Sequence, residues 1–349
     1  MVDEKIMVEK RNRKLLYMLI KKIESEYRND VDFIGLTGSC KSGDFDKYSD
    51  LDLVIIKSDD SDKWFNMCFI NEYDDLDVGY DFYTMDWKYI ASKVGSTWAS
   101  HIIDVEPVWY ASEEVENRWN NLKKKAEENI EQPITKDKIE SAEENLDRAK
   151  RYFSNLMISD KTEDKKRLLS AMLMELTDVI CLLNNTYYTY GIKQRIQEIE
   201  KMKCPNNFSE LYWNAIKADS DVDIKNCAQE VLKSTSIFFK NVKDSIVKIK
   251  LPSADSVRGS YEELVSNYKN KVRRAVENND IQLAVLASCC IQEYIEEMTE
   301  ECGMPEFNIG KYLDLDNLSK LSDGFRELEE VYLAEYKKLG IQADRRCIK

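Results

Sequence analysis

The sequence of 349 residues contains few of the residue types that mark several common kinds of site. Its one histidine, His101, excludes metal sites built from several histidines and argues against a Ser-His-Asp hydrolase. With only 11 Gly and 5 Pro, the chain is expected to form long helices with few irregular loops. No apolar run approaches the roughly 18 residues of a membrane span, and the charged N-terminal stretch has no apolar signal core.

Positively charged residues are outnumbered as well: the chain has 51 Lys and Arg residues and 65 Asp and Glu residues, which gives a net charge of −14. Nucleic-acid binders carry a basic face, so this balance argues against a polynucleotide substrate. It is compatible with a cationic small molecule or a basic partner protein. The 9 Cys residues form no Cys-x-x-Cys pair, and we therefore expect free thiols and a cytoplasmic protein without membrane contact.

The most informative stretch is 38–56, which reads GSCKSGDFDKYSDLDLVII. Its last part, 51–56, is short, apolar and β-branched, which predicts a buried strand. Asp50 and Asp52 are two residues apart, and on a strand this spacing places both carboxylates on one face. Because adjacent carboxylates repel each other, the pair indicates a cation between them.

The beginning of this stretch predicts a phosphate site. Gly38 and Ser39 follow a short apolar strand predicted at 31–37 and precede a predicted short helix. That arrangement offers backbone N–H groups and a hydroxyl to a phosphate. A phosphate site facing a carboxylate pair is what Mg²⁺-assisted phosphoryl or nucleotidyl transfer requires.

These residues resemble the signature of the DNA polymerase β-like nucleotidyltransferase superfamily, in which Gly-Ser is followed after about ten residues by Asp-x-Asp opening a strand. Gly43 and Ser49 match the fuller form of the signature. The segment looks most like the small bacterial members, which include the aminoglycoside-type nucleotidyltransferases of antibiotic resistance. Many relatives carry Arg just before the second Gly, where this chain has Ser42, with Lys41 one place earlier.

The next predicted strand, 76–85, supplies the third carboxylate of the family pattern. Asp77 and Asp81 share one face of that strand, and Asp81 matches the family position better, with Asp77 as the alternative. The resemblance implies ATP as co-substrate and one or two Mg²⁺ ions held by carboxylates. The implied metal-binding and catalytic residues are Asp50, Asp52 and Asp81, and the implied nucleotide contacts are Gly38, Ser39, Lys41 and Ser49.

The segment 175–193, ELTDVICLLNNTYYTYGIK, resembles part of the helical C-terminal domain of aminoglycoside-type adenylyltransferases. This resemblance implies that Tyr187 contacts nucleotide or substrate and that Lys193 reaches the triphosphate. An ordinary helix C-terminus with half-buried tyrosines explains the same pattern, and the two interpretations stay open. Glu175 and Asp178 are the candidates for a separate general base.

The predicted fold class is α+β, with a mixed sheet and flanking helices followed by an all-α region. We expect a catalytic domain over 1–130, a helical substrate- and nucleotide-binding domain over 135–250, and a C-terminal helical subdomain over 255–349. Pro107 predicts that the last strand, 105–111, lies at an edge of the sheet. Helices are expected at 3–28, 63–73, 86–94, 113–129, 137–158, 162–186, 190–202, 207–218, 222–249, 257–276, 279–302 and 322–339.

The function expected from these features is Mg²⁺-dependent transfer of AMP from ATP to a hydroxyl group of a small, cationic, aminoglycoside-like acceptor, with release of pyrophosphate. The alternative is an antitoxin-like or regulatory protein that adenylylates or binds a protein partner. Minimal nucleotidyltransferases of that second kind share the signature but are short. The long helical half of this chain therefore favours the small-molecule acceptor.

Overall fold

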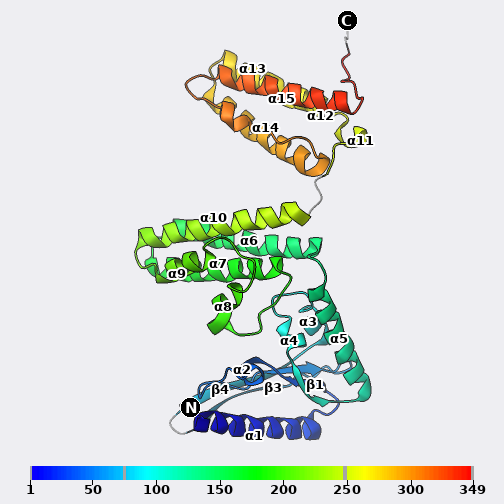
Figure 1. Ribbon diagram of the computed structural model, residues 1–349, viewed down its shortest axis with the longest axis vertical. Helices are drawn as coiled ribbons and strands as arrows, with labels where there is room; N and C mark the ends of the chain where they lie inside the picture. Colours follow the sequence, from blue (N-terminus) through cyan, green and yellow to red (C-terminus); the bar gives the residue numbers. More distant parts are fainter. Residues whose placement is uncertain (1, 74–75, 247–249, 347–349) are drawn as a thin grey trace. The chain divides into compact units, whose positions relative to one another are not determined.

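The computed structural model describes residues 2–73, 76–246 and 250–346 (Figure 1). These residues form two compact units that divide between residues 246 and 247. The first unit contains the strands and the helices up to α10, and the second contains α11 to α15. The further division of the first unit at residues 130–135 stays a prediction.

A mixed sheet forms the first part of this unit, as the sequence predicted, but it has five strands and not the four that were expected. Its strands are β1 (Val31–Leu36), β2 (Leu53–Lys57), β3 (Asn66–Tyr73), β4 (Leu76–Met85) and β5 (Glu106–Tyr110). Their order is β3-β4-β2-β1-β5, so β5 lies at an edge, where Pro107 leaves no ladder hydrogen bond unmade. β2 and β4 are parallel, and the other neighbouring strands are antiparallel.

The prediction of a helix over 63–73 is wrong, because residues 66–73 of this segment form β3. Its side chains alternate between the two faces of the sheet, and the ring of Phe69 stacks on Tyr80 of β4 at 5.3 Å between centroids. Antiparallel pairing with β4 along the whole strand outweighs the Asp and Ser residues that suggested a helix cap. The sheet therefore gains an edge strand that the sequence pattern did not reveal.

Helices cover both faces of the sheet. Helix α1 (Val2–Glu26) lies along one face, where Leu19 and Ile23 pack against Ile55 and Phe82 (Figure 1). The other face is covered by α3 (Trp87–Ala91), α4 (Ser100–Ile103) and α5 (Glu113–Glu131). Burial of these apolar side chains on both faces fixes which residues of each strand remain available for a site.

The rest of the first unit is helical. It consists of α6 (Lys136–Ile158), α7 (Thr162–Leu183), the 3₁₀ turn η1 (Ile192–Gln194), α8 (Arg195–Ile199), α9 (Phe208–Lys217) and α10 (Asp221–Ile246). Helix α7 is the most buried of these and packs against α6, α9 and α10 in one apolar core. The helix expected to continue to 202 is only η1 and the short α8, and the end expected for α10, residues 247–249, lies outside the described residues.

The second unit is helical and has its own core. Its elements are α11 (Ala254–Val257), α12 (Ser260–Leu264), the π-helical turn η2 (Val265–Lys269), α13 (Asn270–Glu277), α14 (Ile281–Cys302), η3 (Ile309–Tyr312) and α15 (Ser319–Lys338). Tyr294, Tyr332 and Tyr336 lie buried in that core. Over the described ranges of both units, we find no helix with the length and apolarity needed to span a bilayer.

Candidate active site

The predicted phosphate loop lies against the first carboxylates of the signature. The predicted short helix is α2 (Gly38–Ser42), directly after β1. The backbone N–H of Thr37 donates to the Asp52 carbonyl at 3.1 Å, which extends the β1–β2 ladder into the site. Gly38 has φ +66°, and a Cβ at this position would lie 1.9 Å from Oδ2 of Asp52. Only glycine allows the backbone this close to that carboxylate.

The parallel register of β2 and β4 brings a second carboxylate to Asp52. Ile55 of β2 pairs with Thr84 of β4. Asp52 lies three residues before Ile55, and Asp81 lies three residues before Thr84. Both side chains therefore lie at one level and on the face away from α1. Asp77 lies four residues further along β4, roughly 13 Å away, which favours Asp81 as the third carboxylate.

The three carboxylates influence one another. Asp52 keeps contact with solvent, but its pKa is raised to about 6. Desolvation of its carboxylate by surrounding atoms is the largest cause, the negative charge of Asp50 raises the pKa as well, and Asp81 adds a smaller increase, while the backbone N–H of Ser39 lowers it. Three acidic side chains from two neighbouring segments thus form one electrostatic cluster, as two carboxylates near a third should.

This cluster fits a divalent cation in its chemistry. Carboxylate oxygens are the ligands that Mg²⁺ prefers, and a cation would remove the repulsion that raises the pKa of Asp52. Within the described ranges, however, no three His, Cys, Asp or Glu side chains are gathered closely enough to form a ready-made metal site. The assignment of Asp50, Asp52 and Asp81 as metal ligands stays a prediction.

Side chains of α1 form hydrogen bonds with the phosphate loop and the Asp50 segment. Asn12 donates to the Asp50 carbonyl at 3.2 Å and to the Cys40 thiol at 3.0 Å, and it accepts from the Tyr80 hydroxyl at 3.2 Å. The guanidinium of Arg11 donates to the carbonyl of Ser49. One buried amide thus links α1, α2, the Asp50 backbone and β4, and this fixes the position of the carboxylates.

Ser49 has a structural contact that accounts for its burial. Its hydroxyl accepts the backbone N–H of Asp46 at 3.0 Å, and its own N–H donates to the Asp46 carbonyl at 3.0 Å. These two bonds close the turn between α2 and the Asp50 segment. The predicted nucleotide contact of Ser49 is untested, but its hydroxyl is already used to shape the loop.

The two predicted basic contacts both reach acidic partners near the loop. Nζ of Lys41 lies 3.7 Å from Glu106 of β5, and Nζ of Lys193 lies 3.4 Å from Asp46. Next to Lys193, the Gln194 amide donates to Asp44 at 2.6 Å. A segment from the helical part therefore contacts the signature loop although about 150 residues separate them in sequence.

We call residues 185–194 the strap, because they connect the helical part to the sheet domain. The Tyr187 hydroxyl donates to Asp104 at 3.1 Å, and the N–H of Tyr188 donates to the Thr97 carbonyl at 3.2 Å. Burial, together with the nearby charge of Asp104, raises the pKa of Tyr187. Tyr187 is therefore placed as a neutral hydrogen-bond donor at the base of the strap.

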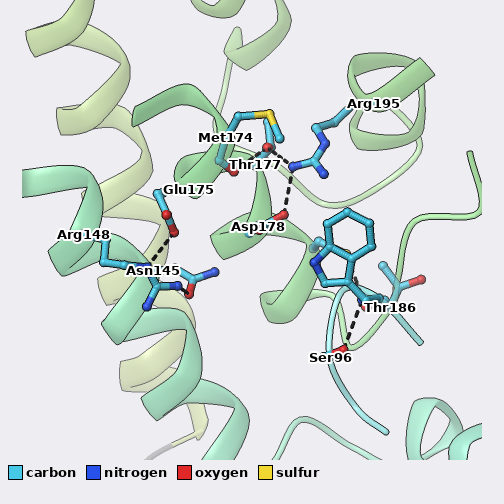
Figure 2. A network of polar contacts seen from close by, with 11 residues as sticks. Ser96, Asn145, Arg148, Met174, Glu175, Thr177, Asp178, Thr186 and Arg195 are labelled. Atoms are coloured by element: carbon cyan, nitrogen blue, oxygen red, sulfur yellow. Dashed lines mark hydrogen bonds and ion pairs between the residues drawn. The ribbon is translucent and has the colours of Figure 1, made fainter. Parts of the chain in front are cut away.

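Both candidate bases on α7 are ion-paired. Glu175 pairs with Arg148 and Asp178 pairs with Arg195, each with a nitrogen–oxygen distance of 3.0 Å. Figure 2 shows both ion pairs. Burial raises the pKa of Asp178 to about 6, although Arg195 opposes the shift. These contacts give the two carboxylates a structural task, and their assignment as general bases stays a prediction.

Three residues of this region escaped the sequence prediction: Asn12, Arg195 and Glu198. Arg195 is buried, and its guanidinium lies 4.2 Å from the Tyr188 ring. Glu198 accepts the strap N–H groups of Thr189 at 2.8 Å and Tyr190 at 3.3 Å. Of these three residues, only Asn12 could have been recognised from the sequence. It is a polar residue on the buried stripe of α1, four residues after Val8.

Comparison with known proteins agrees with this geometry. Residues 16–151 match the family model described as "Nucleotidyltransferase domain". This range includes the phosphate loop and the three aspartates. No curated protein matches the chain. The nucleotidyltransferase domain makes this protein a nucleotidyltransferase enzyme.

Among solved structures, the chain is similar to a nucleotidyltransferase-like protein from Exiguobacterium sibiricum 255-15. The two share 11% sequence identity with a TM-score of 0.37, over 74% of this chain and 90% of that chain. At this TM-score we draw no conclusion from the likeness. Neither comparison distinguishes the aminoglycoside-type members from the rest of the family.

Proposed function

We propose that this enzyme transfers AMP from ATP to a hydroxyl group of a small cationic molecule and releases pyrophosphate. The observation that carries the proposal is the contact between the phosphate loop and the carboxylate cluster. Gly38 lies directly against Asp52, and Asp52 interacts with both Asp50 and Asp81. Phosphate oxygens bound at the loop would therefore lie beside the carboxylates, which is the juxtaposition that nucleotidyl transfer requires.

Each residue of the loop then has a distinct task. The α2 backbone N–H groups after Gly38 bind the β- and γ-phosphates, with the Ser39 hydroxyl as a further donor. Asp50, Asp52 and Asp81 would hold one or two Mg²⁺ ions, which when bound supply positive charge to the attacking and leaving oxygens. Asp81, on the neighbouring strand, orients the acceptor hydroxyl at the α-phosphorus.

The strap supplies the remaining contacts to the nucleotide. Lys193 is largely exposed and pairs with Asp46 on the surface of the loop, a contact worth little by itself. A triphosphate bound at Gly38 would offer Lys193 a more highly charged partner close by. Lys193 would then exchange Asp46 for a phosphate, and its side chain would help to close the strap over ATP.

The charge of the surface supports a cationic acceptor. Asp44 and Asp46 are exposed beside the phosphate loop, and the chain as a whole carries a net charge of −14. An acidic rim attracts a polyamine-like or aminoglycoside-like molecule and repels a polynucleotide. The resemblance to aminoglycoside-type enzymes points to the same class of acceptor.

The test is pyrophosphate release from ATP, CTP, GTP and UTP with Mg²⁺, measured against a panel of aminoglycosides and other hydroxylated amines. We expect release with ATP that depends on both the acceptor and the metal. Nucleotide binding without release by any small acceptor would shift the assignment to a protein acceptor. Absence of both binding and release would refute the role of the loop.

A matched pair of variants tests the third carboxylate. Asp81→Asn and Asp77→Asn remove the same charge from the same exposed face of β4, four residues apart. We expect Asp81→Asn to abolish transfer and Asp77→Asn to leave it close to the wild-type rate, because Asp81, unlike Asp77, acts on the charge of Asp52. Equal rates for the two variants would remove Asp81 from the site.

A further inference from the structure

A long groove lies on the opposite side of the sheet from the carboxylate cluster. It runs between one stripe of α1, from Met7 to Glu26, and the paired strands β3 and β4, and its volume is about 960 Å³. The groove contains no residue of the phosphate loop, the carboxylate cluster or the strap. It is therefore separate from the proposed active site.

The floor of the groove is apolar. It is built from Leu15 and Leu19 of α1, Met67 and Phe69 of β3, and Phe82 of β4, and the polar Asn71 of β3 lines the groove as well. Met67 and Phe82 are cross-strand partners, so the floor extends without a break from one strand to the next. Met18, whose side chain is 56% exposed, forms an apolar edge at the surface.

The rim of the groove is basic. Lys10, Arg11, Lys14 and Lys22 line it together with a single acid, Glu26. Lys22 pairs with Glu26 at 2.6 Å, and the guanidinium of Arg11 donates to loop carbonyls. Lys10 and Lys14 are exposed, and neither has an ionic partner among the side chains that the structure describes. Lys10 and Lys14 thus place two positive charges at the edge of an apolar floor, although the chain has a net charge of −14.

The dimensions of the groove select its occupant. The stripe from Met7 to Glu26 is about 28 Å long at the rise of an α-helix, so a volume of about 960 Å³ corresponds to a mean cross-section of about 34 Å². An α-helix, about 10 Å across, needs about 80 Å². The groove is too narrow for a helix and has room for a single extended chain.

We propose that this groove binds a long-chain fatty acid, with its alkyl chain on the apolar floor and its carboxylate at Lys10 and Lys14. The apolar floor stabilises the chain by removing it from water, and the two lysines supply the positive charge that the carboxylate requires. A long-chain carboxylate matches both the length of the groove and the charge of its rim.

Calorimetric titration of the full-length protein with hexadecanoate tests this proposal, with hexadecanol and octanoate as comparison ligands. We expect hexadecanoate to bind at least tenfold more tightly than either one, and its affinity to fall as salt is added. Equal affinity for hexadecanol would refute the role of the lysines. Tighter binding to phospholipid vesicles than to hexadecanoate would replace the free acid with a membrane surface and overturn the proposal.

Charge-reversal variants locate the head group. Lys10→Glu with Lys14→Glu should weaken hexadecanoate binding about tenfold or more. The control is Arg13→Glu with Lys21→Glu, which changes the net charge of the same helix equally at positions outside the groove. Equal loss in both double variants would overturn the proposed site.

A second pair of variants tests the apolar edge. Met18→Asp places a carboxylate in the groove, whereas Met157→Asp makes the same change at a 40% exposed position at the end of α6. We expect only Met18→Asp to reduce hexadecanoate binding. Sedimentation velocity of the wild type completes the test, since a dimer that Met18→Asp dissolves would assign the groove to a second copy of the chain instead.

Discussion

Replacement of Gly38 by alanine, which adds one methyl group, should abolish activity while the protein stays folded. A Cβ here would lie 1.9 Å from Oδ2, 2.6 Å from Cγ and 2.7 Å from Cβ of Asp52. Real Cβ atoms do not approach other atoms so closely, so in Gly38→Ala the whole Asp52 side chain must move. The carboxylate that is closest to the phosphate loop would then leave its place in the cluster.

The expected magnitudes differ for stability and activity. The left-handed φ of +66° costs a non-glycine residue roughly 1–2 kcal/mol, which lowers the melting temperature by about 2–4 °C per kcal/mol in a unit of this size. A displacement of about 1 Å at a catalytic group lowers the rate about a hundredfold. Gly38→Ala should therefore remain folded and lose almost all pyrophosphate release.

Gly43→Ala is the matched control. Gly43 has φ +76°, so alanine there suffers the same backbone strain, but no atom lies within 4 Å of its Cβ position. Denaturant unfolding should show similar losses of stability in both variants, while pyrophosphate release should fall only in Gly38→Ala. Equal activity in the two variants would refute the argument that the Gly38–Asp52 contact positions the site.

Three further predictions test the cluster, the strap and the buried ion pair. Asp52→Asn should abolish transfer without loss of stability, because it removes a carboxylate whose charge its neighbours oppose, and unfolding curves and rates check both parts. Lys193→Gln should raise the KM for ATP about fivefold with little change in stability, whereas Lys201→Gln, an exposed lysine beyond the strap, should leave KM unchanged. Asp178 has a folded pKa of about 6, above the ordinary aspartate value of 3.8, so the folded state binds more protons than the unfolded state between these values, and the free energy of unfolding should fall as the pH rises from 4 to 6. The fall is at most about 3 kcal/mol, and Asp178→Asn should flatten this part of the stability–pH profile; an unchanged profile would contradict the assignment.

Much of the fold followed from local patterns. The β-branched runs of β1 and β2, the alternation along β4 and the long helical periodicities were readable because each depends on neighbours in sequence. β3 was not, since its strand conformation depends on pairing with β4, and its Asp- and Ser-rich start imitates a helix cap. The correct edge position of β5 followed from a single residue, Pro107.

The sequence by itself determined the candidate chemistry of this protein. Gly38, Ser39, Asp50 and Asp52 lie within one short segment, so their spacing along a turn and a strand already indicates a phosphate site beside paired carboxylates. The identity of the nucleotidyltransferase domain depends on the same local signature, and the family model matched it.

Only the tertiary structure decided which distant residues join that segment. The parallel register of β2 and β4 places Asp81, and not Asp77, beside Asp52. The strap brings Lys193 to Asp46 across about 150 residues, and Arg195 and Glu198 hold it there. The family resemblance pointed to Asp81 and Lys193, but local sequence patterns do not carry their contacts with Asp52 and Asp46. These contacts arise from the packing of separately formed elements, in which register and burial select the neighbours.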